Sequence, residues 1–208
     1  MSTMIKAQFP DEQESDGSFN RQADAFNDWV RADGSSAYPA QAGRYHLYVS
    51  LACPWASRTV IVRKLKGLED AIGMTVVDPV RDERGWRFMH DQRDPLNGWA
   101  FLSEAYFASD PGYSRRVTVP VLWDKERKRI VSNNDDHIMR MFESEFDEFA
   151  ANPQLDLYPR ALRHEIDKLN DFLYQTLNNG VYRAGFATAQ EKYDEAVKGV
   201  FATLGWLE

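Results

Sequence analysis

Cys53 is the single cysteine of the chain, and its position indicates nucleophilic chemistry. It follows an aromatic-rich run from Tyr45 to Val49, which is typical of a buried strand. It precedes Pro54, and proline favours the first turn of a helix because its missing N–H would be unpaired there. A thiol at such a junction faces unpaired N–H groups and the positive end of the helix dipole, which lower thiol pKa values. We therefore interpret Cys53 as a nucleophile rather than as a small buried core residue.

The absence of a second cysteine determines what kind of thiol chemistry is possible. In a Cys-x-x-Cys redox motif the second thiol would stand at position 56, which is Ala56 here. Because no internal disulfide can form, a covalent intermediate on Cys53 must be resolved by an external thiol. The sequence therefore predicts a two-step reaction in which a low-molecular-weight thiol is the co-substrate. We expect no tightly bound cofactor and no metal site, since no histidine has metal-ligand spacing and no Gly-rich phosphate loop occurs.

Composition narrows the class of protein and its partners. With 208 residues, 43% of them hydrophobic, the chain can bury a sizeable core and resembles an ordinary water-soluble protein. The net charge of −7 disfavours a nucleic-acid partner. No apolar run approaches the roughly 20 residues of a membrane span, and we find no signal peptide. One unpaired cysteine fits a reducing compartment, so we expect a cytoplasmic protein that binds neither nucleic acid nor membrane.

The middle of the chain predicts a small sheet around the Cys53 helix. A second strand over 74–78 would complete a strand–helix–strand unit with parallel strands. A further strand signal over 116–123 contains Pro120, and a cis X-Pro bond at the start of the strand would accommodate it. Ile130 and Val131 predict an antiparallel partner, and polar residues 132–136 then cap a helix. The apolar face of that helix is formed by Ile138, Phe142, Phe146 and Phe149.

The last part of the chain predicts two amphipathic helices. The first runs from Leu162 to Leu177 and is closed by Asn178-Asn179-Gly180, a C-terminal turn signal. Residues 188–191 have the form of a capping box that opens the second helix. The loop expected between the helices holds Tyr182, its one suitable proton donor.

Several of these motifs resemble the glutathionyl-hydroquinone reductases, also called Xi-class glutathione transferases. The matching stretches are Cys53 to Ala56, Arg63 to Leu68, Gly85-Trp86, Arg116 to Pro120 and Asn178 to Tyr182. The resemblance implies a thioredoxin-like α/β domain followed by an all-α domain of the glutathione transferase type. We expect an N-terminal extension over 1–43, the thiol-binding domain over 44–150, and the first helices of the all-α domain over 151–208. The chain looks truncated within that last domain, and a homodimer is expected if the full domain is present.

The resemblance also implies roles for individual residues. Those expected to bind glutathione are Trp86, Arg116, Val117, Thr118, Val119, Asn134 and Asp135. The backbone near Val119 would face Cys53 and hold the thiol ligand like an added strand. Tyr182 would be the proton donor or acceptor to the bound substrate.

One position departs from the family pattern. A Glu-Ser pair that holds the γ-glutamyl end of glutathione in the family is Asn134-Asp135 here. Asp135 together with Asp136 would repel a carboxylate, so we hypothesise that glutathione binds weakly or that another thiol replaces it. A plain acidic helix cap is the alternative interpretation of these two residues.

The implied activity is thiol-dependent removal of glutathione, or a similar low-molecular-weight thiol, from S-conjugated hydroquinones through a mixed disulfide on Cys53. The expected partners are therefore a small-molecule thiol and a quinone conjugate. Two alternatives remain open. A general monothiol thiol-transferase would use Cys53 without Tyr182, and a non-catalytic binding module with the same fold would need neither residue.

Overall fold

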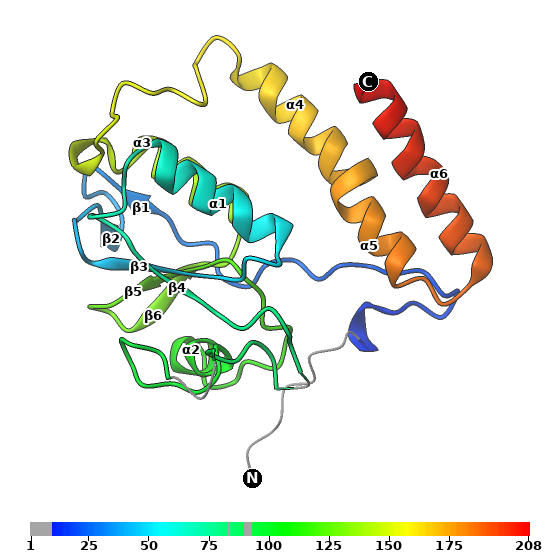
Figure 1. The fold of residues 1–208 in the computed structure, drawn as a ribbon, viewed down its shortest axis with the longest axis horizontal. Coiled ribbons are helices and arrows are strands. Elements are labelled where there is room, and N and C mark those ends of the chain that lie inside the picture. The colour runs from blue at the N-terminus through cyan, green and yellow to red at the C-terminus, as the bar shows by residue number, and fades with distance from the viewer. Residues whose placement is uncertain (1–9, 83, 90–92) are drawn as a thin grey trace. The chain divides into compact units, whose positions relative to one another are not determined.

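The computed structural model describes residues 10–82, 84–89 and 93–208. Packing divides the described chain into two compact units (Figure 1). Residues 24–157 form an α/β unit, and residues 10–23 together with 158–208 form a helical unit. The domain borders expected near residues 43 and 150 stay predictions, because packing within one chain does not show which parts fold alone.

A four-stranded sheet with the order β4-β3-β5-β6 forms the centre of the α/β unit. The strands are β3 (Tyr45–Val49), β4 (Gly73–Val76), β5 (Val121–Asp124) and β6 (Arg129–Ser132). Strand β3 is parallel to β4 and antiparallel to β5, and β5 is antiparallel to β6. The predicted parallel and antiparallel pairs are thereby confirmed. Every residue of β3 is buried, since helices cover both faces of the sheet.

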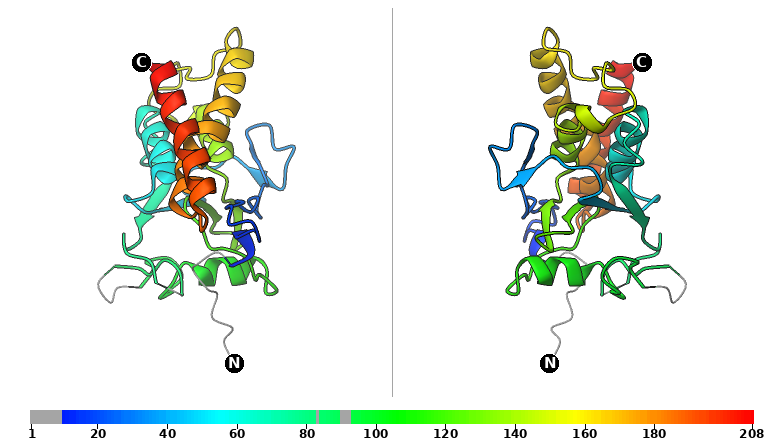
Figure 2. Two further views of the ribbon diagram at one scale, coloured as in Figure 1. Left: turned by 90° about the vertical axis from the view of Figure 1, so that its right-hand side faces the viewer. Right: turned by 90° about the vertical axis from the view of Figure 1, so that its left-hand side faces the viewer.

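Three helices cover this sheet. They are α1 (Pro54–Leu65), α2 (Ser103–Ser109) and α3 (Asp135–Ser144). Helices α1 and α3 pack together on one side, and α2 lies on the other (Figure 2). Outside the sheet, β1 (Val30–Arg31) and β2 (Tyr38–Pro39) form a small parallel pair. The β3–α1–β4 unit and the antiparallel β5–β6 pair give the thioredoxin-like arrangement that the sequence predicts.

Two predicted elements are shorter than expected. The strand expected over 116–123 begins only at Val121, after the cis bond between Val119 and Pro120, and that cis bond is confirmed. The preceding segment is not a strand because Thr118 bonds through its backbone to the Tyr106 side chain instead of to a neighbouring strand. Helix α3 likewise ends at Ser144, and the expected apolar face continues into a separate 3-10 turn, η2 (Asp147–Phe149).

The helical unit consists of one long helical run, a second helix and an N-terminal segment. The run is formed by α4 (Arg163–Leu173), a π-helical turn η3 (Tyr174–Asn178) and α5 (Asn179–Gly185). Helix α6 (Gln190–Leu207) runs back alongside α5. The N-terminal segment contains a short 3-10 helix, η1 (Pro10–Glu12). Within the described ranges, no helix is both long and apolar enough to cross a membrane.

The turn expected at Asn178-Asn179-Gly180 is wrong, because the chain stays helical there. A Cβ added at Gly180 would lie 2.8 Å from Cγ2 of Val200 on α6. Glycine at this position therefore permits close packing of two helices rather than a C-terminal turn. As a result Tyr182 lies on α5 and not in a loop.

The predicted capping box at residues 188–191 is also wrong. Ala189 is the N-cap of α6 and makes no side-chain cap hydrogen bond. The backbone N–H of Thr188 donates instead to the carbonyl of Gly17, at 2.9 Å. The N-terminal segment, and not a local side chain, therefore contacts the start of this helix.

Candidate active site

Cys53 occupies the position that the sequence predicts, at the N-cap of α1, and a short turn separates it from the end of β3 at Val49. Its side chain is half-buried, and its thiol donates to the carbonyl oxygen of Val119 over 3.6 Å. No acidic residue stands in the first turn of α1, so no carboxylate of that turn offsets the positive end of the helix dipole. The start of the helix therefore favours a thiolate able to attack another sulfur, whereas the hydrogen bond to Val119 favours the neutral thiol and is lost on ionisation.

The segment that faces Cys53 is fixed by Tyr106. The Tyr106 hydroxyl accepts from the N–H of Thr118 at 3.1 Å and donates to the carbonyl of the same residue at 2.9 Å. Burial raises the pKa of Tyr106 to about 12, so its hydroxyl remains a donor at neutral pH. The hydroxyl of Thr118 also accepts from the side-chain amide of Asn133 at 3.0 Å. Thr118 is therefore held by protein partners on three sides and positions Val119 next to the thiol.

Asn134 and Asp135 lie at the start of α3, in the same unit as Cys53. Asn134 caps the helix, since its side-chain carbonyl accepts from the N–H of His137 at 3.0 Å. Its amide donates to the carboxylate of Asp24 at 2.9 Å. Both polar ends of the Asn134 side chain are thus engaged by the protein, which supports the helix-cap interpretation for this residue.

Asp135 pairs with a cation on the cysteine helix. Its Oδ2 lies 2.8 Å from Nη1 of Arg58, and Asp136 lies 3.7 Å from the same guanidinium. Burial raises the pKa of the Asp135 carboxyl to about 6; the Arg58 guanidinium opposes this rise, and Asp136 and Asp24 add to it. Asp135 is therefore mostly ionised at neutral pH. Asp136 also lies 3.7 Å from Arg140, so two guanidinium groups lie among the three carboxylates of Asp24, Asp135 and Asp136, and the net charge around Asp135 is negative.

These contacts join three elements into one site. The pairs that connect them are Cys53 with Val119, Thr118 with Asn133, and Asp135 with Arg58. Arg58 lies on α1, one to two turns after Cys53. The three contacts therefore form a closed ring that links the start of α1, the segment before β5 and the start of α3. In the described part of the chain, no three His, Cys, Asp or Glu side chains converge so that they could hold a metal ion.

Trp86 is placed near this ring of contacts because the preceding residue, Gly85, lies close to Val117. A Cβ added at Gly85 would lie 3.8 Å from Cβ of Val117, so the turn before Trp86 contacts the segment that faces Cys53. The indole N–H of Trp86 is buried and has no hydrogen-bond partner among the described residues. A ligand could accept a hydrogen bond from it only if the groups that cover it moved aside. Arg116 contributes its carbonyl, which accepts from the Tyr113 hydroxyl at 2.6 Å, and so helps to fix the same segment.

Tyr182, the second predicted catalytic residue, belongs to the helical unit. It lies on α5 with the guanidinium of Arg21 4.3 Å from the centre of its ring. The ring of Phe186, one turn further along, lies at 6.1 Å. That Tyr182 acts on a substrate bound at Cys53 stays a prediction.

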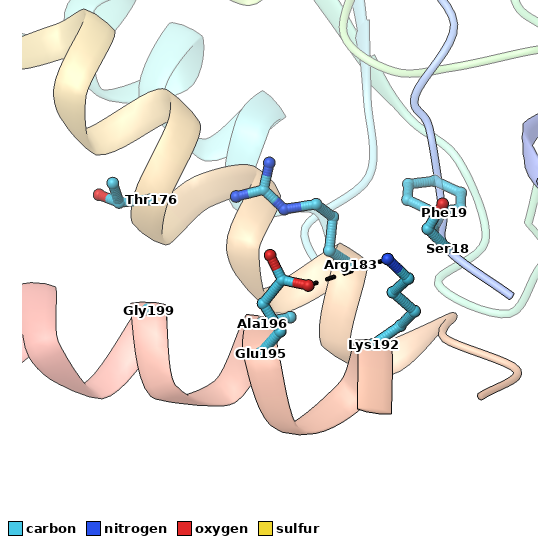
Figure 3. A pocket seen from close by; sticks show the side chains of 8 residues that line it. All are labelled: Ser18, Phe19, Thr176, Arg183, Lys192, Glu195, Ala196 and Gly199. Carbon is cyan, nitrogen blue, oxygen red and sulfur yellow. Dashed lines mark ion pairs between the residues drawn. The ribbon is translucent and has the colours of Figure 1, made fainter. Parts of the chain in front are cut away.

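The helical unit also holds a cavity of about 380 Å³ between the N-terminal segment and helices α5 and α6 (Figure 3). Its polar lining includes Ser18, Thr176, Arg183, Lys192 and Glu195. Lys192 forms ion pairs with Asp16 at 3.1 Å and Glu195 at 4.0 Å. Acidic and basic side chains therefore balance, and no residue with a predicted role lines the cavity. We assign it no chemistry.

Sequence reasoning missed Arg58, Tyr106 and Asn133, which orient the predicted residues. Arg58 stands five residues after Cys53, which marks it as a neighbour on the same helix. Its partner Asp135 is 77 residues away in the sequence, and no local pattern signals that pairing. The contacts of Tyr106 and Asn133 with Thr118 span only 12 and 15 residues, but they too become visible only in the folded chain.

Comparison with known proteins identifies related chains. Residues 52–145 match the family described as glutathione S-transferase, N-terminal domain. The glutathionyl-hydroquinone reductase YqjG of Escherichia coli is 51% identical, with 95% of this chain and 63% of that protein covered. A glutathione S-transferase omega-like 2 of Schizosaccharomyces pombe is 44% identical, with 99% and 67% covered. This chain therefore spans a little under two thirds of the length of the E. coli relative.

Solved structures agree with this relationship. The Xi glutathione S-transferase of Phanerochaete chrysosporium superposes with a TM-score of 0.89 and 47% identity, covering 94% of this chain and 64% of that one. The glutathione-bound structure of E. coli YqjG superposes with a TM-score of 0.82 and 52% identity, covering 88% and 62%.

Proposed function

The chain belongs to the glutathionyl-hydroquinone reductases, the Xi class of glutathione transferases, and from this premise we propose that it reductively removes a thiol from S-conjugated hydroquinones. The observation that carries the proposal is Cys53, a lone thiol at the start of α1 beside the Val119 carbonyl. The E. coli relative bears the name of this activity. Because the chain spans 63% of that relative, activity, substrate and partners are all part of the proposal.

In the first half-reaction the Cys53 thiolate attacks the sulfur of the conjugate. A disulfide bond forms between the two sulfurs, and the bond from sulfur to the ring carbon breaks. The electron pair of the broken bond goes to the ring carbon, which takes a proton from Tyr182. The ring is thereby reduced, the free hydroquinone leaves, and a mixed disulfide remains on Cys53.

In the second half-reaction a thiolate from solution attacks the mixed disulfide. A disulfide of the two small thiols is released, and the Cys53 thiolate is regenerated. The protein needs no second cysteine for this step, which accords with Ala56 at the position of a resolving thiol. The half-buried sulfur leaves room for the incoming thiol.

Glutathione is the thiol that the relatives support, since the YqjG structure contains it. Trp86, with its unpartnered indole N–H, and the segment from Arg116 to Val119 would bind it. Asp135 and Asp136 would weaken the hold on a ligand carboxylate at the start of α3. A weaker affinity for glutathione, or a preference for another small thiol, therefore belongs to the proposal. A homodimer and a cytoplasmic location also stay proposals; the resemblance supports the first and the lone cysteine the second.

The test is intact mass spectrometry of the protein mixed with a glutathionyl-hydroquinone and no second thiol. We expect one glutathione adduct per chain and one equivalent of hydroquinone released, with no adduct on the Cys53→Ser variant. Folded wild-type protein that forms no adduct and releases no hydroquinone would contradict the proposal. An adduct formed from oxidised glutathione but not from the conjugate would indicate a general thiol-transferase. No adduct from either compound would indicate a binding module.

A further inference from the structure

Arg21 lies over the ring of the predicted proton donor. Its guanidinium carbon is 4.3 Å from the centre of the Tyr182 ring, well within the range of a cation–π interaction. Its Nε donates to the side-chain carbonyl of Asn179 at 2.8 Å. Asn179 is buried and stands one turn before Tyr182 on the same helix. The guanidinium is therefore held in place over the ring from α5 itself.

The segment that carries Arg21 is anchored on both sides of it. The N–H groups of Asn20 and Gln22 each donate at 2.8 Å to Glu12, whose side chain is buried. Further back, the carbonyl of Gly17 accepts from Thr188. These bonds fix the backbone on either side of Arg21, so its placement is built into the helical unit.

Aromatic packing adds to this anchorage. The buried ring of Phe19 lies 5.2 Å from the ring of Phe186, which in turn lies beside Tyr182. Asp16 pairs with Lys192 of α6 at 3.1 Å. Lys192 and Phe19 both line the cavity in Figure 3. The N-terminal segment thus reaches the Tyr182 helix through both polar and apolar contacts.

We infer that Arg21 is a positioning residue for Tyr182, so that the N-terminal segment takes part in the reaction. The inference rests on the proposed function, in which Tyr182 protonates the ring carbon of the departing hydroquinone. When the phenol gives up its proton, its ring becomes richer in electrons, and its attraction to the guanidinium increases. An interaction that is stronger in the transition state than in the ground state accelerates the step in which it strengthens. The guanidinium also fixes the plane of the ring and with it the direction of the hydroxyl.

Two variants test this role. Arg21→Met removes the positive charge, and Arg21→Lys keeps the charge but lacks the planar guanidinium group. We expect Arg21→Met to slow hydroquinone release in a single turnover by about three- to thirtyfold, the rate equivalent of a cation–π interaction. The reaction of Cys53 with oxidised glutathione needs no proton on carbon, and it should keep its wild-type rate. Arg21→Lys should recover part of the lost rate. Asn179→Ala removes the side-chain carbonyl that holds the guanidinium, so it should also slow hydroquinone release.

Lys192→Met is the matched control, because it breaks an ion pair of the same segment without touching the Tyr182 ring. The bonds to Glu12 and Asn179 that hold Arg21 remain, so both reactions should be unchanged. Wild-type hydroquinone release in Arg21→Met, or an equal loss in both reactions, would overturn the inference. The Tyr182→Phe variant distinguishes a failure of the inference about Arg21 from a failure of the proposed function. If it slows release and Arg21→Met does not, only the inference is wrong, whereas full release in Tyr182→Phe overturns the proton-donor role and the inference together.

Discussion

Arg58 and Asp135 form an ion pair of 2.8 Å that joins the cysteine helix α1 to the first turn of α3. The Asp135 side chain is 14% exposed and the Arg58 side chain 32%, so the pair is partly shielded from solvent. The same guanidinium also faces Asp136 at 3.7 Å, and Asp136 is 43% exposed. Arg58 is therefore occupied by protein carboxylates, and a ligand carboxylate at this end of the site would meet net negative charge.

Asp135→Ser is expected to raise kcat/KM for glutathione by about three- to tenfold, because it removes a repelling carboxylate and frees Arg58 to attract a ligand carboxylate. Steady-state kinetics with varied glutathione would measure the change. Asp136→Ser is the control: its carboxylate is more exposed and farther from Arg58, so its effect should be smaller. A fall in kcat/KM for Asp135→Ser would show that Asp135 helps to bind glutathione and does not repel it.

Replacement of Cys53 should abolish turnover while leaving the fold intact. Cys53→Ser is expected to lower the rate of hydroquinone release by about a thousandfold or more, since a hydroxyl at neutral pH is a far weaker nucleophile than a thiolate. Its side chain makes no cap hydrogen bond, so the free energy of unfolding should change by less than about 1 kcal/mol. Stopped-flow absorbance of the hydroquinone and a thermal melt would measure both quantities. Residual turnover near the wild-type rate would exclude Cys53 as the nucleophile.

Tyr182→Phe should distinguish the reductase from a general thiol-transferase. The variant keeps the ring that packs under Arg21 but lacks the hydroxyl, so the helical unit should stay folded. We expect hydroquinone release to slow by about a hundredfold, which is typical of the loss of a general acid. Exchange with a mixed disulfide should be unaffected. Equal rates of release in the variant and the wild type would favour the thiol-transferase.

His46 should make stability depend on pH. Its burial in the sheet lowers its pKa from 6.5 to about 4, and nearby Lys125 and Arg63 act in the same direction against Asp94. As pH falls from about 6.5 to about 4, the unfolded chain gains a proton that the folded chain does not. This contribution to the free energy of unfolding is therefore fully present above pH 6.5. It falls by up to about 1.4 kcal/mol per pH unit as the pH drops from about 6.5 to about 4. Urea unfolding of wild type and His46→Gln at several pH values would measure this slope, and equal slopes would contradict the prediction.

Gly180→Ala should destabilise the helical unit. The added methyl group would lie 2.8 Å from Val200, a short branched side chain that is 9% exposed and has little freedom to move. We expect a loss of about 1–3 kcal/mol, the usual cost of overpacking. Gly199→Ala on α6 is the matched control, since no atom lies within 4 Å of its added Cβ and alanine favours a helix. Unchanged or increased stability in Gly180→Ala, or a loss of the same size in both variants, would show that contact with Val200 does not govern this position.

The α/β core and the place of Cys53 at the start of a helix follow from the sequence alone, because those signals are local. An aromatic-rich strand, a cysteine and a helix-starting proline follow one another within ten residues, and the neighbouring backbone decides what each of them does. The cis bond before Pro120 was predictable for the same reason, since proline conflicts with a strand interior wherever it occurs.

Features that depend on residues far apart in the sequence became apparent only in the folded chain. Gly180 looked like a helix end, but Val200 of another helix requires a glycine there, and so Tyr182 is helical. The contacts of Asp135 with Arg58 and of Tyr182 with Arg21 span 77 and about 160 residues. A pattern of neighbouring residues carries no information about such pairs, because side-chain contacts form only when packing brings distant elements together.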